Sequence, residues 1–381
     1  MIDVKGKDIP EIKNMISGGR NVLYGAGNTG KKVCEILKDY GIDILAFLDD
    51  DVLKHGNKIF GKPVISREKL SDVIQQAGEI NVILASIYTA ASEAKLKEFL
   101  PKVHLYNAYP LYLEYAGKED YADLLSLLQS RDEWMDKMGN LSKIFNDEKS
   151  LKIVSAVECT AHTYWNEGIV DIQWLQKTES QEEHYFIKEV QSALGQDSII
   201  VDCGAFTGDM LGQLSCLQIP YKTLYAFEAN PDVYSILLDN IHKNNLENKV
   251  KSFMSGVWSE AGVQYFQSAS PLATSGKIVS GEVDRLQKIN VDKLDNIINE
   301  KIDLLKMDIE GAELPALKGA ETLMLTSRPI LAISVYHSLD DFVDIPLYLQ
   351  ALLADYSFFL KHHSSGIGET VLYGIPKERG I

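Results

Sequence analysis

Three ionisable side chains in the last quarter of the sequence directly follow short apolar runs. Asp308 and Glu310 come after Leu304–Met307, and His337 ends the run Leu331–Tyr336. Such runs, bounded by turn residues, are typical of buried strands in a parallel sheet. Because ligands bind beyond the carboxyl ends of these strands, the pattern predicts that the three groups share one ligand-binding edge. Histidine has an ordinary pKa of about 6.5, so His337 is best suited to remove a proton from a hydroxyl, with Asp308 orienting it.

Other interpretations of these residues stay open. Lys306 lies two strand positions before Asp308, hence on the same face, and competes with His337 as the base. A structural alternative is that Asp308 and Glu310 cap the helix predicted to start near Ala312. A metal ion held by Asp308, Glu310 and His337 is geometrically conceivable. The four cysteines show no CxxC pair and no histidine partner at ligand spacing, so we expect free thiols and no structural zinc. We assign no residue to a metal site.

A glycine loop supplies a second group of candidates. In Ile199–Asp209 an apolar strand leads into Gly204 and Gly208 and then into a predicted helix. Glycine lets the backbone approach a ligand closely, and the first amides of a helix are free to donate hydrogen bonds. Glu228 lies twenty residues beyond Gly208, at the end of the next predicted strand, where a carboxylate can accept hydrogen bonds from ribose hydroxyls. Loop and acid together predict a nucleotide-type cofactor.

Three segments of the second half carry a specific resemblance. VDCGAFTGD, FEANP and LLKMDIEGAELPALKGA, within about Tyr185 to Pro376, resemble the FkbM family of S-adenosylmethionine-dependent methyltransferases. The resemblance implies a class I methyltransferase sheet, with the first segment around the methionine end of the cofactor, Glu228 on its ribose and Ser255–Trp258 beside its adenine. The expected cofactor-binding residues are Asp202, Gly204, Ala205, Phe206, Gly208, Glu228, Ala229, Asn230, Gly256 and Val257.

The resemblance implies transfer of a methyl group to a hydroxyl, and we expect the acceptor to be a sugar or polysaccharide precursor. The expected catalytic residues are His337, Asp308, Glu310 and Lys306. Tyr164, Trp165 and Trp174 could stack on a sugar ring, although core packing explains them equally well.

A second glycine loop lies near the N-terminus. Gly25, Gly27 and Gly30 have the G-x-G-x-x-G spacing, and Asp49 lies nineteen residues past Gly30. This context is that of a dinucleotide-binding unit. YGAGNTG, FLDDD and GKPVI resemble the nucleotide-binding N-terminal domains attached to sugar-modifying enzymes, so a nucleotide, a nucleotide-sugar or NAD is a candidate second ligand. A rival function therefore stays open, namely a nucleotide-dependent binding or scaffold protein whose methyltransferase domain is degenerate.

The alternation of patterns predicts an α/β chain in three parts. Residues 1–110 are expected to form a Rossmann-like nucleotide-binding domain, 111–195 a helical connector or cap, and 196–381 the methyltransferase domain. Strands are predicted at Val22–Tyr24, Ile44–Leu48, Val82–Ala85, Val103–Tyr106, Ile199–Val201, Thr223–Phe227, Val250–Met254, Leu304–Met307 and Ile330–Tyr336, with a closing hairpin of Tyr356–Lys361 and Thr370–Ile375. Helices are predicted at Lys31–Tyr40, Tyr121–Leu128, Glu182–Leu194 and after the N-cap Asn230, where Val233, Ile236, Leu237 and Ile241 should face the sheet.

Composition excludes several classes of protein. With 381 residues, 45% hydrophobic and 24% charged, the chain is of ordinary globular type. Its 38 basic and 54 acidic residues give a net charge of −16, which disfavours nucleic acid and anionic membranes as partners. No apolar run reaches the roughly 20 residues of a membrane span, and the first residues lack the pattern of a signal peptide. We expect a cytoplasmic protein that acts on a small molecule or glycan, and a homo-oligomer stays open.

Overall fold

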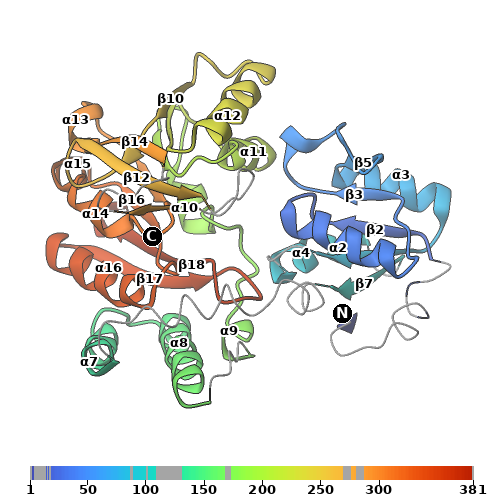
Figure 1. Ribbon diagram of the computed structural model, residues 1–381, viewed down its shortest axis with the longest axis horizontal. Coiled ribbons are helices and arrows are strands. Elements are labelled where there is room, and N and C mark those ends of the chain that lie inside the picture. Colours follow the sequence, from blue (N-terminus) through green and yellow to red (C-terminus); the bar gives the residue numbers. More distant parts are fainter. Residues whose placement is uncertain are drawn as a thin grey trace.

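The computed structural model has two main sheets, each covered by helices and lying side by side (Figure 1). It describes residues 2–3, 14, 16, 19–85, 89–99, 102–108, 131–167, 173–268, 276–279 and 287–379. The strands of the first sheet lie between residues 2 and 107, and those of the second between residues 199 and 376. The predicted α/β class is confirmed. The limits at 110/111 and 195/196 remain a proposal.

The N-terminal sheet has the strand order β1-β7-β6-β2-β3-β5-β4. Its neighbours pair in parallel except β4 and β5. The central strands β2 and β6 are apolar along most of their length because both faces are buried. The strands are β1 (Ile2–Asp3), β2 (Asn21–Tyr24), β3 (Ala46–Leu48), β4 (Lys58–Ile59), β5 (Lys62–Ile65), β6 (Ile80–Leu84) and β7 (Val103–Asn107). The helices are α2 (Asn28–Asp39), η1 (Val52–Lys54), α3 (Arg67–Ala77), α4 (Thr89–Leu96) and η2 (Lys97–Phe99).

The C-terminal sheet has the order β10-β9-β8-β15-β16-β18-β17. The first five strands in this order pair in parallel, and β18 is antiparallel to both of its neighbours. The strands are β8 (Ile199–Cys203), β9 (Thr223–Glu228), β10 (Val250–Met254), β15 (Leu304–Met307), β16 (Ile330–Ser334), β17 (Tyr356–His362) and β18 (Thr370–Pro376). The helices of this unit are α11 (Asp209–Cys216), α12 (Pro231–Lys243), α13 (Leu294–Ile297), α14 (Glu313–Lys318), α15 (Glu321–Ser327), α16 (Leu339–Leu352) and η3 (Lys377–Arg379).

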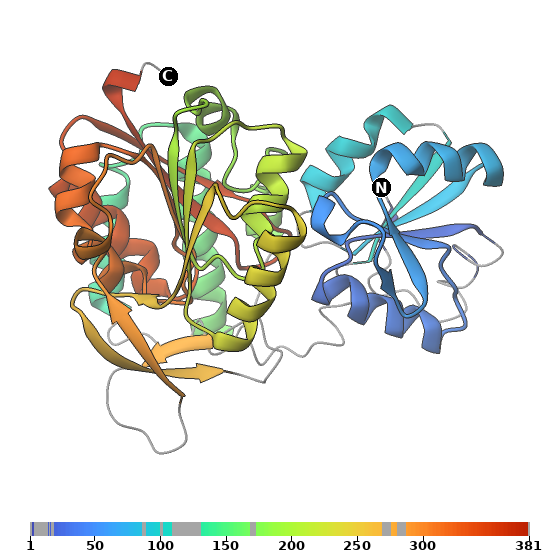
Figure 2. The ribbon, with the colours of Figure 1, turned by 90° about the horizontal axis from the view of Figure 1, so that it is seen from above.

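Helices lie on both faces of the C-terminal sheet (Figure 2). Alternate residues of a strand point to opposite faces. Along β15, Leu304 packs in the apolar cluster that contains α11 and α12, whereas Leu305 and Met307 pack in the cluster that contains α14, α15 and α16. Lys306 therefore belongs to the α11–α12 face. This charge in the middle of a buried strand needs a partner there.

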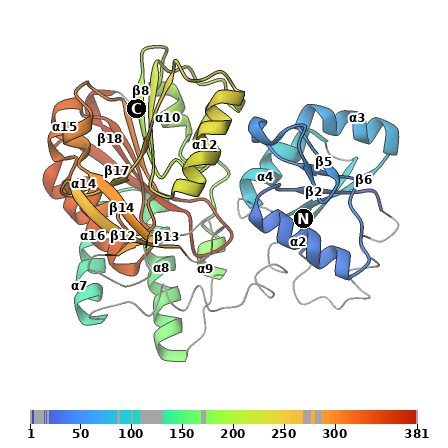
Figure 3. The same cartoon turned by 45° about the horizontal axis from the view of Figure 1, so that its top comes forward.

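The helices of the connector do not follow the predicted pattern throughout. They are α7 (Arg131–Leu141), α8 (Glu148–Glu167), α9 (Gln173–Gln176) and α10 (Lys188–Ala193), and α7 and α8 lie beneath α16 in Figure 3. The prediction of a helix over Glu182–Leu194 is wrong for its first half, because only α10 is helical. Tyr185 has a φ of +64°, which no residue inside an α-helix adopts. Tyr121–Leu128 lies outside the described residues.

A small sheet between β10 and β15 was not predicted. Its order is β11-β14-β12-β13, formed by β11 (Gly256–Val257), β12 (Gly262–Ser268), β13 (Gly276–Val279) and β14 (Gln287–Asp292). In β14 only Ile289 and Val291 are buried. Two apolar residues among polar neighbours give too weak a strand signal in the sequence.

The remaining predicted elements are confirmed, with strand ends shifted by at most two residues. Asn230 caps α12 by accepting a hydrogen bond from the backbone N–H of Asp232. One detail is wrong. Val233, Leu237 and Ile241 are buried as predicted, but Ile236 is 45% exposed, so it does not face the sheet.

The loop after β3 joins the two units. Leu53 of η1 packs against the apolar cluster that contains α11. A Cβ atom on Gly212 of α11 would lie 2.3 Å from Oδ1 of Asp51, so a larger residue there would displace the Asp51 carboxylate. Lys95 of α4 also pairs with Glu183 at 2.9 Å. The N-terminal unit thus contacts the helix that directly follows the predicted cofactor loop.

Among the described helices, none combines the length and the apolar character that crossing a membrane requires.

Candidate active site

The carboxyl ends of β8 and β15 form the centre of the candidate site. From β8 the chain proceeds outward to β9 and β10, whereas from β15 it proceeds to β16 on the other side. Such a switch point is where open α/β sheets bind ligands. The loops after the two strands touch, because a Cβ atom on Gly204 would lie 1.8 Å from the backbone oxygen of Asp308. Gly204 also has a φ of +81°, so only glycine fits between the loops.

A buried ion pair lies beneath this contact. Asp202 and Lys306 are register partners on β8 and β15, and Oδ1 and Nζ are 2.8 Å apart with side chains 2% and 6% exposed. The adjacent register positions are Ala226 and Ala332, whose small side chains leave room for the pair. Burial raises the pKa of Asp202 against the opposing effect of Lys306. Burial alone would lower the pKa of Lys306, but the charge of Asp202 outweighs it and raises this pKa.

The ion pair suits a positioning role better than proton transfer. Because its pKa is raised, Lys306 stays protonated and cannot accept a proton as a base would. Its ammonium donates to the backbone oxygen of Gly204 at 2.9 Å, which holds the glycine loop from below. Asp202 faces this ammonium in the interior, and its contact with a cofactor remains a prediction.

Glu228, the last residue of β9, is hydrogen-bonded to the glycine loop. Its Oε2 accepts from the backbone N–H of Phe206 at 2.9 Å, and its Oε1 accepts from that of Asn230 at 2.8 Å. Each carboxylate oxygen keeps a second lone pair. Burial raises the pKa of this carboxyl, while the two backbone donors oppose the shift. The arrangement leaves a half-buried acid able to accept further hydrogen bonds from a ligand.

The other residues expected at the cofactor lie either in the loop after β8 or in and beside the small sheet. Ala205 and Gly208 are buried within the loop after β8. Gly256 is buried in β11, and Val257 is part of the core behind the sheet. Ala229 packs with Trp258, Ile289 and Val291 at the edge of the small sheet. That sheet is thus adjacent to the acid-bearing end of β9.

Asp308 is surrounded by donors. The hydroxyl of Tyr185 donates to Oδ2 at 2.7 Å, that of Tyr336 donates to Oδ1 at 3.1 Å, and Nε2 of His337 is 3.4 Å from Oδ1. Burial would raise the pKa of Asp308, but His337 and Lys306 lower it to about 2. Asp308 is therefore a permanent anion at neutral pH.

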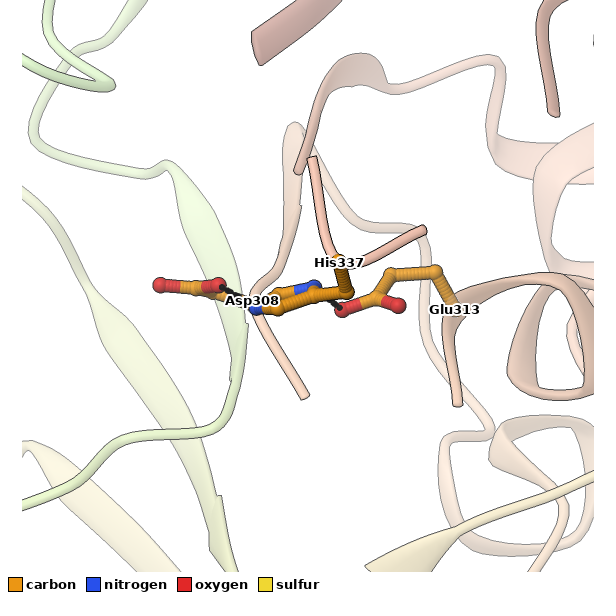
Figure 4. Close-up of side chains that lie close together, drawn as sticks. All are labelled: Asp308, Glu313 and His337. Carbon is orange, nitrogen blue, oxygen red and sulfur yellow. Dashed lines mark ion pairs between the residues drawn. The ribbon is translucent and has the colours of Figure 1, made fainter. Parts of the chain in front are cut away.

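His337 lies between two carboxylates, as Figure 4 shows. Its Nδ1 is 3.0 Å from Oε1 of Glu313, on the side opposite Asp308. Burial would lower the pKa of His337, but Glu313, Asp308 and Glu310 outweigh it and raise the pKa to about 10. The imidazole is thus a cation at neutral pH. Glu313 contributes most to this upward shift of the pKa, and Asp308 and Glu310 enlarge it.

Glu310 has the surroundings of a proton acceptor. Burial raises its pKa to about 7, with Asp308, Glu313 and Glu228 adding to the shift and His337 opposing it. Its side chain is 36% exposed, and Oε2 lies 3.5 Å from Nε2 of His337. The backbone has a φ of +59°, a strained conformation for a residue other than glycine. A carboxyl with this pKa exchanges protons readily near neutral pH.

The sequence did not predict the roles of Tyr185, Tyr336 and Glu313. Glu313 accepts from the backbone N–H of Ile309 at 2.7 Å and of Gly311 at 3.0 Å, which closes the turn that presents Glu310. The alternative that Asp308 and Glu310 cap this helix is wrong, since α14 begins at Glu313 without a side-chain cap. Glu313 could have been identified from the sequence as a carboxylate three residues past Glu310. Nothing in the sequence indicated Tyr185.

Asp308, Glu313 and His337 each offer a ligand atom within 4.8 Å of the others, so the candidate metal set differs from the expected one by Glu313 in place of Glu310. Glu313 already serves two backbone donors and His337. We therefore assign the three side chains to an ion-pair cluster.

The N-terminal loop repeats the geometry of Glu228. Asp49 accepts from the backbone N–H of Ala26 at 2.7 Å and of Asp51 at 2.9 Å. A Cβ atom on Gly30 would lie 1.8 Å from the backbone oxygen of Gly25, whereas one on Gly27 would meet nothing within 4 Å. Unlike Glu228, Asp49 has a lysine within reach, because Nζ of Lys54 is 3.6 Å away.

The aromatic residues of the connector do not form a sugar pocket among the described side chains. Trp165 packs at the edge of the core, with its ring centroid 5.3 Å from that of Trp134. Trp174 is 46% exposed and lies beside Lys177. The side chain of Tyr164 is not described.

The C-terminal unit has a Rossmann-like fold with its candidate site at the switch point of the sheet. Residues 202–358 match the model of the methyltransferase FkbM domain. The matched residues, 202–358, therefore form an FkbM methyltransferase domain within the C-terminal unit.

Two known proteins are similar to this chain, one in sequence and one in fold. The chain is 25% identical over 199 residues to methyltransferase sdnD of Sordaria araneosa, a match that covers 43% of this chain and 75% of that protein. Its fold is similar to that of the methyltransferase FkbM of Methylobacillus flagellatus KT, with a TM-score of 0.53 and 19% identity. The alignment covers 95% of this chain and 92% of the other.

Proposed function

We propose that the protein transfers a methyl group from S-adenosylmethionine to a hydroxyl of a sugar or polysaccharide precursor. The family match supports the cofactor. The observation that carries the proposal is the position of Glu228, whose carboxylate is fastened to the glycine loop at the switch point of the sheet. At the same edge lies a carboxyl, Glu310, with a pKa of about 7.

The residues present fit S-adenosylmethionine. Glu228 has free lone pairs for two ribose hydroxyls, and at the start of the glycine loop Gly204 accepts a hydrogen bond from Lys306 and packs against the backbone of Asp308. When bound, the cofactor supplies an electrophilic methyl group. The chain itself must then bind the acceptor and remove its hydroxyl proton.

Among the ionisable groups of the cluster, Glu310 is the proposed base. Asp308 has too low a pKa to hold a proton, and His337 and Lys306 have raised pKa values that keep them protonated. We assign Asp308 and His337 to positioning, because their ion pair and the hydroxyl of Tyr336 fix the edge against which an acceptor would lie.

Substitution Glu228→Gln should weaken binding of S-adenosylhomocysteine by about 10- to 100-fold, since hydrogen bonds to a charged group contribute about 1.5–3 kcal/mol. Titration calorimetry measures this. Asp49→Asn is the matched control, because Asp49 accepts the same two backbone hydrogen bonds in the other unit. Equal affinities for Glu228→Gln and wild type would contradict the assignment of the site, and loss of affinity in Asp49→Asn would move it to the N-terminal loop.

Removal of divalent cations should leave methyl transfer unchanged. The carboxylates of the cluster are already balanced by His337 and by backbone donors. The measurement is transfer of labelled methyl to a panel of sugar nucleotides before and after treatment with EDTA. Activity that EDTA abolishes and Mg²⁺ restores would contradict the ion-pair assignment.

The same assay separates the proposal from its rival. Release of S-adenosylhomocysteine with transfer of label to a sugar acceptor supports it. A nucleotide that co-purifies with the protein, together with no methyl transfer to any acceptor, would favour the nucleotide-binding scaffold.

A further inference from the structure

We infer that Tyr185 is a positioning residue for methyl transfer and that Lys95 of the N-terminal unit holds it in place through Glu183, an inference that rests on the proposed function. Residues 182–185 lie between α9 and α10 and are neither helix nor strand. Each of their side chains contacts a distant element. The contacts are Glu182 with Lys361 of β17, Glu183 with Lys95 of α4, His184 with Glu369 before β18, and Tyr185 with Asp308 after β15.

The Tyr185 side chain is fixed from several sides. Its backbone φ is +64°, a strained conformation that persists only when the surroundings hold it. Its backbone N–H donates to the hydroxyl of Tyr373 at 3.1 Å, and its ring stacks on that of His184 with centroids 3.7 Å apart. Nζ of Lys306 lies 5.1 Å from the centre of the same ring, within the range of a cation–π contact. The strained backbone thus brings one side chain into contact with both Lys306 and Asp308.

The hydroxyl of Tyr185 fixes the orientation of the Asp308 carboxylate. It donates to Oδ2, whereas Oδ1 faces Tyr336 and His337. Burial raises the pKa of Glu310, and the negative charge of Asp308 adds to this shift. A hydrogen-bond donor on Asp308 neutralises part of that charge and so limits its effect. Tyr185 therefore acts on the proposed base through Asp308.

Lys95 anchors this segment from the N-terminal unit. Its Nζ is 2.7 Å from Oδ2 of Asp50 and 2.9 Å from the carboxylate of Glu183. Asp50 is itself fixed within the N-terminal unit, because it also accepts from the hydroxyl of Tyr24 at 2.7 Å and pairs with Nε of Arg67 at 2.9 Å. The side chains of Lys95 and Glu183 are only 20% and 21% exposed, so each charge depends on its partner.

The two contacts of the segment are interdependent, because Glu183 lies only two positions before Tyr185. Without Lys95, the carboxylate of Glu183 would turn toward water. The strained backbone of Tyr185 would then lose one of the anchors that hold it, and the hydroxyl would leave Asp308. The N-terminal unit thus acts on the reaction without contributing a group to it.

The first test needs neither acceptor nor cofactor. Carbon-13 NMR of the full-length protein with labelled glutamate carboxyl groups follows the titration of Glu310, whose resonance is identified by its loss in Glu310→Gln. The wild-type midpoint should lie at a pH of about 7. Tyr185→Phe keeps the ring but removes the hydroxyl, so the less neutralised charge of Asp308 should raise the midpoint by about 0.5 pH unit. Lys95→Met should shift it in the same direction, and the double variant should shift it no further than Tyr185→Phe alone.

Two variants control for the loss of charge. Lys97→Met removes an exposed lysine two positions from Lys95 and should leave the midpoint unchanged. Lys95→Arg keeps the charge and should retain the wild-type midpoint. If Lys95→Met does not fold, Glu183→Gln breaks the same ion pair from the other side.

A second measurement follows transfer of labelled methyl to the panel of sugar nucleotides. Tyr185→Phe and Lys95→Met should each lower kcat by about 2- to 10-fold, the usual net effect of one hydrogen bond. The KM for S-adenosylmethionine should change little, because Glu228 and the glycine loop keep their own hydrogen bonds.

An unchanged Glu310 midpoint in folded Tyr185→Phe would overturn the inference, and so would a wild-type midpoint in Lys95→Met. Shifts of the two variants that add in the double variant would mean that Lys95 acts by a route other than Tyr185, which also contradicts it. Failure of the proposed function has a different signature. The wild type would then not bind S-adenosylhomocysteine in calorimetry, whereas the NMR titration would still decide whether Lys95 and Tyr185 act on Glu310.

Discussion

Substitution Glu310→Gln is expected to lower the turnover of methyl transfer by about 10²–10⁴-fold, the usual contribution of a general base. Binding of S-adenosylhomocysteine should stay close to normal, because Glu310 does not contact the glycine loop in the observed hydrogen bonds. In the wild type, kcat/KM should rise with pH through about 7 and then level, since the base must be unprotonated and burial raises the pKa of Glu310 to about 7. An ordinary glutamate would place this limb near pH 4.3.

His337→Gln distinguishes the two candidate bases. If Glu310 is the base, this variant retains a pH limb, and the limb moves above 7 because the cation that opposes the raised pKa of Glu310 is gone. If His337 is the base, as its residue type suggested, the wild-type limb lies near its own pKa of about 10 and disappears in the variant. A limb near 10 that survives Glu310→Gln would return the role to His337.

Substitution Asp202→Ala is expected to destabilise the C-terminal unit by about 3–5 kcal/mol, because it leaves the ammonium of Lys306 buried without its anion. Thermal or urea unfolding measures the change. Asp202→Ala combined with Lys306→Met should recover most of the loss, since no uncompensated charge then remains. Asp239→Ala, an exposed position on α12, is the control and should change stability by less than about 0.5 kcal/mol.

The same variant tests the predicted contact of Asp202 with the cofactor. Loss of S-adenosylhomocysteine binding without any loss of stability would mean that the carboxylate acts directly on the ligand. Unchanged stability and unchanged binding would contradict both the energetic role of the ion pair and the predicted contact.

Much of the framework could be predicted from the sequence, because it depends on local patterns. The strands of both sheets are short apolar runs between turn residues, and the spacing from Gly208 to Glu228 reflects one helix and one strand. The prediction that Asp308, Glu310 and His337 meet at one edge required only that parallel strands end together. The small sheet from β11 to β14 was missed, because its strands bury too few residues to leave a pattern.

The assignment of protons within the site could not be predicted. It depends on burial and on neighbours supplied by distant segments, such as Tyr185, which lies 123 positions from Asp308. The sequence does not indicate the role of Glu313, because its backbone contacts arise only when the turn closes around it. The ordinary pKa of histidine favours His337 as the base, but three carboxylates raise that pKa in the folded protein.

The close contact between Asp51 and Gly212 constrains the evolution of the chain. A side chain at position 212 would displace the carboxylate of Asp51 in the loop after β3, and α11, which carries Gly212, starts where the cofactor loop ends. A substitution at this interface would therefore also shift the loop that the cofactor is proposed to contact. A recombination event that replaced the N-terminal unit would succeed only if the incoming unit brought a compatible loop, so the two halves are expected to be inherited together.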